Sequence, residues 1–142
     1  MPYKEGMSSA RQVGQKAGSM IVLVDTSVWI RFLSNRAPYA AELDRLLERD
    51  EASGHPFVYG ELLMGDKGGH REVLEIYTLI SHAPVVPHRE VVTFARERRL
   101  HGRGVGWVDV HLLASALVGR LKLWTTDARL TAVARELGVA YD

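Results

Sequence analysis

The chain has 142 residues and a formal net charge of +1, with 46% hydrophobic and 25% charged residues. This composition is ordinary for a soluble globular domain and excludes collagen-like, coiled-coil and wholly disordered chains. The absence of cysteine excludes disulfides, thiolate metal sites and cysteine nucleophiles. No apolar run approaches the ~20 residues that cross a bilayer, so we expect a cytoplasmic protein with no membrane contact.

Residues 1–19 differ from the rest of the chain. They show little apolar periodicity, are interrupted by glycine and serine, and lack the apolar core of a signal peptide. Gly18–Ser19, just before Met20, looks like a cloning scar, and Met20 looks like the natural start. We interpret residues 1–19 as a vector-derived or flexible extension and residues 20–142 as one domain; a native extension is the alternative.

From Met20 onward, short apolar runs alternate with helical patterns. The predicted strands are 21–24, 55–58, 85–86, 121–125 and 139–141, and the predicted helices are 28–33, 40–49, 61–64, 71–80, 89–100, 108–118 and 128–137. The run 21–24 is continuously apolar, as in a strand covered on both faces, and 108–118 is typical of a buried helix. This alternation predicts a three-layer α/β/α domain with a mostly parallel central sheet.

Four acidic residues stand in apolar or tight-turn surroundings. Asp25 and Asp127 each follow a predicted strand, Asp109 opens the most apolar helix, and Glu61 lies in a short helix. Each has a structural explanation when taken alone: an Asx turn, a helix cap, a favourable helix dipole, or an exposed helix position. Because the carboxyl ends of parallel strands meet at one edge of a sheet, we expect the four to converge there.

Converging carboxylates repel one another unless a cation lies between them. Mg²⁺ and Mn²⁺ prefer oxygen ligands, and such an ion can lower the pKa of a bound water and stabilise charge on a phosphodiester. A bound cation would also attract a polyanion, which a chain of near-neutral charge does not do by itself.

Four sequence motifs, in order and at matching spacing, resemble those of PIN-domain ribonucleases, specifically the VapC toxins of bacterial toxin–antitoxin pairs. The motifs are Val24–Ile30, Glu61–Gly65, Gly106–Ala116 and Leu123–Leu130, and the resemblance covers 20–142. It implies an α/β/α PIN fold and an Mg²⁺- or Mn²⁺-dependent endoribonuclease.

The resemblance also assigns roles to residues. It implies Asp25, Glu61, Asp109 and Asp127 as the catalytic acids, the three aspartates as metal ligands, and the hydroxyls of Ser27 and Thr125 as support for the carboxylates. It implies an RNA substrate, a homodimer, and a cognate VapB antitoxin whose C-terminal segment occupies the groove.

Two further surfaces follow from the sequence. Arg96, Arg98, Arg99 and Arg103 form the densest basic cluster, just before the Asp109 loop. Arg103 and Arg99 are candidates for RNA phosphates, although a solvated helix face explains the cluster equally well. The apolar residues of the early helices, including Trp29, Ile30, Phe32, Leu62 and Leu63, are candidates for the homodimer face.

Two other functions fit parts of the sequence. One is a catalytically silent nucleic-acid-binding or interaction module on the same fold, which the intact acids disfavour. The other is a haloacid-dehalogenase-like phosphatase, but that chemistry needs a second aspartate two residues after Asp25, where Ser27 stands.

Overall fold

A computed structural model describes residues 20–142, so the interpretation of residues 1–19 lies outside the described residues. The sheet has three parallel strands in the order β2-β1-β3. They are β1 (Val22–Val24), β2 (Ala52–Ser53) and β3 (Lys122–Trp124). Central strand β1 is fully buried, which agrees with its uninterrupted apolar sequence.

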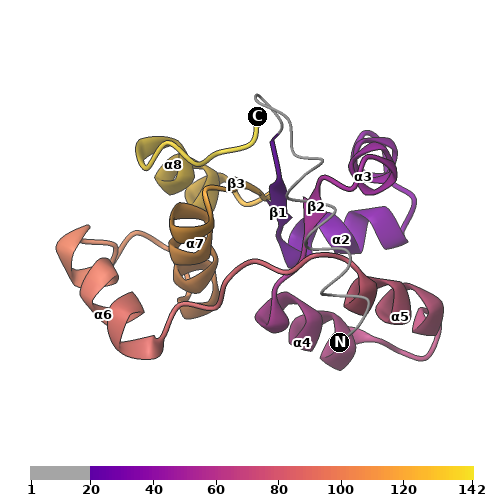
Figure 1. The fold of residues 1–142 in the computed structure, drawn as a ribbon, viewed down its shortest axis with the longest axis horizontal. Coiled ribbons are helices and arrows are strands. Elements are labelled where there is room, and N and C mark those ends of the chain that lie inside the picture. Colours follow the sequence, from indigo (N-terminus) through magenta and orange to yellow (C-terminus); the bar gives the residue numbers. More distant parts are fainter. Residues whose placement is uncertain (1–19) are drawn as a thin grey trace.

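Helices lie on both sides of this sheet. They are α2 (Thr26–Leu33), α3 (Tyr39–Glu48), α4 (Pro56–Gly65), α5 (Arg71–Leu79), α6 (His88–Glu97), α7 (Trp107–Gly119) and α8 (Ala128–Glu136). Figure 1 shows α2 to α5 on one side of the strands and α6 to α8 on the other. The predicted three-layer α/β/α architecture is confirmed.

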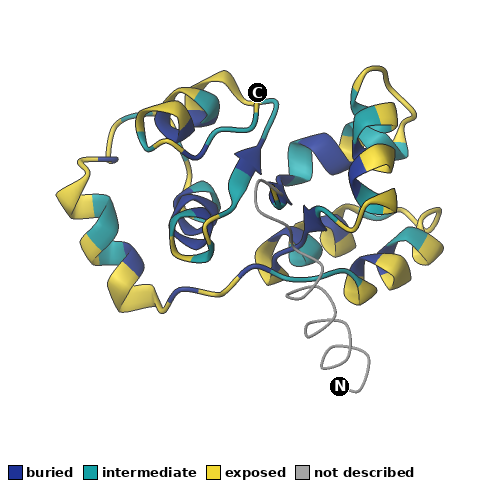
Figure 2. Cartoon of the chain, turned by 45° about the horizontal axis from the view of Figure 1, so that its top comes forward, coloured by how far each residue is buried: buried dark blue, intermediate teal, exposed yellow. Residues whose placement is uncertain are grey.

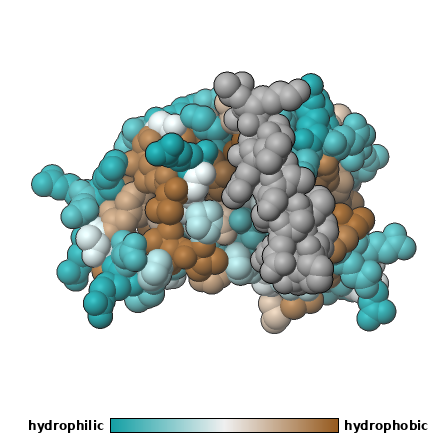
Figure 3. Space-filling view, in the orientation of Figure 1, coloured by the Kyte–Doolittle hydropathy of each residue, from teal (hydrophilic) through white to brown (hydrophobic). Residues whose placement is uncertain are grey.

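The core follows the predicted pattern. Every residue of α7 from Val110 to Ala116 is buried, as its apolar sequence predicts, and Figure 2 shows α7 dark blue along its middle while α6 is largely exposed. Figure 3 nevertheless shows hydrophobic surface in the region of α7. Val118, near the end of α7, is 64% exposed.

The predicted strand 55–58 is wrong. The strand of this region is Ala52–Ser53, which pairs with Val22–Leu23, and His55 is instead the N-cap of α4, its Nδ1 accepting a hydrogen bond from the Phe57 amide at 3.1 Å. Pro56 explains the difference, because a proline lacks the N–H that a strand needs and suits the first position of a helix.

Two other predicted strands are reduced or absent. Residues 85–86 form no strand among residues 20–142, since Pro84 and Pro87 on either side have no N–H to donate. The neighbouring pairing is a single bridge between Gly54 and His82. Residues 139–141 make only one bridge, between Leu123 and Ala140.

The expected dimer face is divided by the structure. Trp29 and Leu62 are 1% and 7% exposed and belong to the core of the chain itself, whereas Ile30 and Leu63 are 52% and 48% exposed. Only the second pair is therefore available to a partner.

Within residues 20–142, no helix combines the length and apolar composition that crossing a bilayer requires.

Candidate active site

Asp25 is the buried centre of the acidic site. It directly follows β1, and its amide donates to the Trp124 carbonyl at the end of β3, at 2.9 Å. Its Oδ2 accepts two hydrogen bonds, from Ser27 Oγ at 2.7 Å and from Thr125 Oγ1 at 2.8 Å. The parallel pairing of β1 and β3 therefore places these hydroxyls, 98 positions apart in the chain, on one carboxylate.

The same hydroxyls hold the segment that carries Asp127. Ser27 Oγ accepts from the Thr126 amide at 3.1 Å, and Thr125 Oγ1 accepts from the Asp127 amide at 3.1 Å. Asp127 is the N-cap of α8, and its Oδ1 accepts from the amides of residues 129 and 130. The capping explanation for Asp127 is thus correct, and it leaves the other carboxylate oxygen uninvolved.

Asp109 and Glu61 are each held by one hydrogen bond. Asp109 Oδ2 accepts from the Gly106 amide at 2.9 Å, which fastens the start of α7 to the preceding loop. Glu61 lies exposed on α4, and its Oε1 accepts from Thr26 Oγ1 at 2.5 Å. Because Thr26 is the neighbour of Asp25, this contact brings α4 to the end of β1.

Asp25, Asp127 and Glu61 lie within electrostatic reach of Asp109. Burial raises the pKa of Asp109, the Gly106 hydrogen bond opposes this, and the negative charges of Asp25, Asp127 and Glu61 raise the pKa further. None of the four forms an ion pair with a lysine, arginine or histidine among residues 20–142. Negative charge at this edge of the sheet is therefore not balanced by any described side chain.

The donor set suits a hard divalent cation. Each carboxylate uses one oxygen for the hydrogen bonds given above and keeps the other without a hydrogen bond to any residue in 20–142. Oxygen donors with uncompensated charge are the environment that Mg²⁺ and Mn²⁺ select. Among residues 20–142, no three acidic or imidazole groups are close enough to hold one ion. Mutual repulsion of carboxylates favours this separation.

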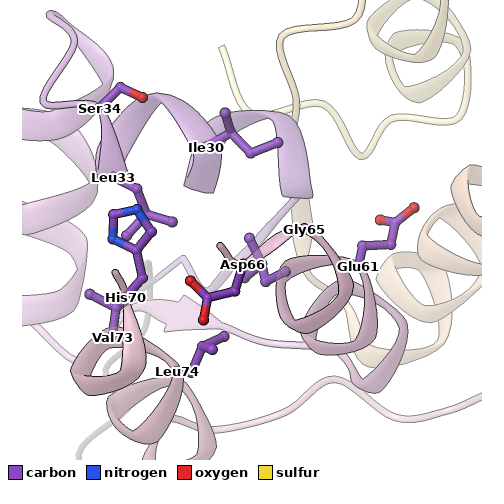
Figure 4. A pocket seen from close by; sticks show the side chains of 10 residues that line it. Ile30, Leu33, Ser34, Glu61, Gly65, Asp66, His70, Val73 and Leu74 are labelled. Carbon is purple, nitrogen blue, oxygen red and sulfur yellow. The ribbon is translucent and has the colours of Figure 1, made fainter. Parts of the chain in front are cut away.

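A mostly apolar pocket of about 220 Å³ adjoins this site. It lies between α2, α4 and the start of α5, and Ile30 and Leu33 form part of its wall. Glu61 stands at its edge with its carboxylate directed away from Asp66 (Figure 4). Asp66 also lines the pocket, and its Oδ1 is buried and has no hydrogen-bond partner among the described residues.

The candidate RNA-binding arginines are placed differently from one another. Arg103 forms two hydrogen bonds with Glu136, at 2.6 and 3.0 Å, so its charge is already paired. Arg99 follows α6 in a left-handed conformation. Arg129 is not among the predicted site residues, yet its side chain lies against Gly104 in the loop before Asp109. Only its position two residues after Asp127 could have pointed to it.

Comparison with known proteins agrees with this arrangement. The PIN domain family matches residues 22–136. Ribonuclease VapC32, from two strains of Mycobacterium tuberculosis, is 49% identical over 121 residues, which cover 84% of this chain and 95% of the relative. The crystal structure of PAE2754 from Pyrobaculum aerophilum has the same fold, with a TM-score of 0.54, 20% identity, and coverage of 80% of this chain and 79% of the other.

Proposed function

Because this chain belongs to the PIN-domain family as a VapC-type ribonuclease, we propose that its four clustered carboxylates hydrolyse RNA phosphodiesters. The protein is an endoribonuclease that acts as the toxin of a toxin–antitoxin pair. The observation that carries the site assignment is the open oxygen on each of Asp25, Glu61, Asp109 and Asp127 around one uncompensated patch.

Ribonucleases of this family are generally metal-dependent, and we propose Mg²⁺ or Mn²⁺. Asp25, Asp109 and Asp127 would hold the ion, which supplies a Lewis acid that activates water and stabilises the negative charge of the phosphodiester. Ser27 and Thr125 orient the Asp25 carboxylate, because both donate to the same oxygen and leave the other without a hydrogen bond to any residue in 20–142.

Glu61 is proposed to position and deprotonate the attacking water. Its carboxylate is exposed and is oriented by the Thr26 hydroxyl, so Oε2 is available to accept the proton. A base must be within hydrogen-bond reach of the proton that it accepts, and the contact between α4 and the end of β1 brings Glu61 to the edge of the acidic patch.

We propose the pocket beside Glu61 as the docking site for the C-terminal segment of a VapB-type antitoxin. Its wall is apolar, Ile30 is 52% exposed, and Asp66 and Glu61 add negative charge. An apolar side chain followed by a basic one would match this combination. Occupancy next to Glu61 would block access of RNA to the acids.

The test is incubation of the purified protein with structured RNAs in Mg²⁺, in Mn²⁺ and in EDTA. We expect cleavage with either ion and none with EDTA. A Glu61→Gln variant should bind RNA but cleave it at least about 100-fold more slowly, since proton transfer contributes about 10²–10⁴-fold. Binding without cleavage in every ion would favour the catalytically silent module instead.

A further inference from the structure

Trp107 is an exposed aromatic residue at the edge of the acidic site. It is the first residue of α7, two positions before Asp109, and is 43% exposed, whereas Trp29 and Trp124 are 1% and 9% exposed. Its indole therefore contributes less to the core than either of the other two tryptophans.

The indole is nevertheless held in place by neighbouring rings. The centroids of His88 and His111 lie 5.4 and 5.1 Å from that of Trp107, both edge-to-face. His111 is 4% exposed and packs in turn against Phe57 at 4.7 Å. An exposed ring braced from the core loses little conformational freedom when a ligand stacks on it.

Arg129 lies against the loop that precedes Trp107. A Cβ at Gly104 would stand 2.5 Å from Arg129 Cδ and 2.9 Å from Nη1, so the side chain rests on backbone that only glycine leaves open. The Arg129 amide is also fastened to Asp127 Oδ1 at 2.8 Å. The backbone of Arg129 is thus joined to Asp127, and its side chain lies against the loop that precedes Asp109.

The charge of Arg129 is unused within the described part of the chain. Nearby Arg103 and Arg135 are both ion-paired, with Glu136 and Asp142, but the Arg129 guanidinium has no ion pair or hydrogen bond with any of residues 20–142. An unpaired guanidinium on a side chain that packs against this loop is suited to a phosphate oxygen.

Gly104, against which the Arg129 side chain lies, and Trp107 are three positions apart in the segment that leads to Asp109. Proteins hold single-stranded nucleic acid through aromatic stacking platforms combined with cationic contacts to phosphates. We propose that the Trp107 indole stacks a nucleobase of single-stranded RNA and the Arg129 guanidinium binds a nearby phosphate oxygen. This inference rests on the proposed ribonuclease function and names the residues that position its substrate.

The three tryptophans supply a direct readout, because only Trp107 is open to solvent. An RNA of about 12 nucleotides, within the size range of single-strand sites, is titrated into the intact chain in EDTA and into the Glu61→Gln chain in Mg²⁺. We expect RNA to quench the tryptophan fluorescence and to reduce its quenching by acrylamide. Trp107→Phe should abolish both changes.

Affinities of the variants complete the test. Trp107→Ala should weaken RNA binding about 10-fold, within the range of losing one stacked base, and Trp107→Phe should retain part of that affinity. Arg129→Gln should weaken binding about 10-fold and reduce the salt slope by about 0.7, the value for one phosphate of a single strand, while Arg129→Lys retains most of the binding. Thermal melts identify any variant that fails to fold.

Arg135→Gln is the matched control, because Arg135 is an exposed arginine on the same helix whose charge is already paired. It should change the affinity less than twofold. The inference is overturned if Trp107 stays accessible to acrylamide in the presence of RNA and the Trp107 and Arg129 variants bind RNA normally. If the unaltered chain still binds and cleaves RNA in that case, the proposed function stands. If the variants lose antitoxin binding but not RNA binding, the inference is also wrong. A chain that neither binds nor cleaves RNA would refute the proposed function itself.

Discussion

Replacement of Asp109 by asparagine separates a metal-ligating role from a capping role. Asparagine keeps the shape and an oxygen that can accept the 2.9 Å hydrogen bond from the Gly106 amide, but it removes one negative charge from the acidic patch. Asp109 is the third residue of α7, and asparagine can accept the same hydrogen bond from the N-cap amide. A purely structural role for Asp109 therefore predicts almost no change in activity.

The stability of the metal-free protein should move in the opposite direction to activity. Burial and the three neighbouring carboxylates raise the pKa of Asp109, so the ionised form destabilises the fold at neutral pH, and this cost disappears as the pH falls below the raised pKa. Asparagine carries no such charge. We expect the Tm of metal-free Asp109→Asn at pH 7 to equal or exceed that of the unaltered chain.

The increase in Tm caused by cation binding is a second quantity to measure. An ion present at 100 times its Kd stabilises the folded chain by about 2.7 kcal/mol, which corresponds to a Tm increase of about 9 °C for a domain of this size. Asp109→Asn should lose most of that increase. Cleavage should fall at least about 100-fold, since a loss of about 3 kcal/mol of transition-state stabilisation changes a rate by that factor.

The assay pairs thermal melts in EDTA and across a Mn²⁺ titration with RNA cleavage rates at each Mn²⁺ concentration. Wild-type cleavage by Asp109→Asn throughout that titration would refute the assignment of Asp109 to the metal site. A metal-free Tm lowered by more than about 5 °C, equivalent to about 1.5 kcal/mol, would show instead that the aspartate mainly holds the start of α7.

Three further outcomes test other parts of the structure. Ser27→Ala removes one of two donors to buried Asp25, so unfolding free energy should fall by about 1–3 kcal/mol in urea titrations, and cleavage should fall with it. Burial lowers the pKa of His55 to about 4. The neutral imidazole therefore contributes fully to stability above the unfolded pKa of about 6.5, and this contribution is lost as the pH falls toward 4, by at most about 3 kcal/mol. His55→Asn keeps an N-cap acceptor and should flatten the pH dependence of stability in melts from pH 4 to 7. Ile30→Glu places a charge on the apolar pocket wall, so calorimetry should show antitoxin binding weakened at least tenfold while RNA cleavage is unchanged.

Local sequence pattern predicted β1, β3 and most of the helices, and it singled out the four acids as candidates. Continuous apolar runs identified β1 and α7, and the position of Asp25 and Asp127 after strands followed from the parallel topology that alternation implies. The misassignment of residues 55–58 has a local cause as well, since a proline after a capping residue resembles the start of an edge strand.

The tertiary structure alone decided which groups are paired and which remain available. Ser27 and Thr125 meet on one oxygen of Asp25 only because β1 and β3 are neighbours, and Arg103 is paired by a glutamate 33 positions away. Periodicity also could not distinguish the buried Trp29 from the exposed Trp107. These properties depend on contacts between distant segments. A pattern of neighbouring residues carries no information about which distant side chain a residue contacts.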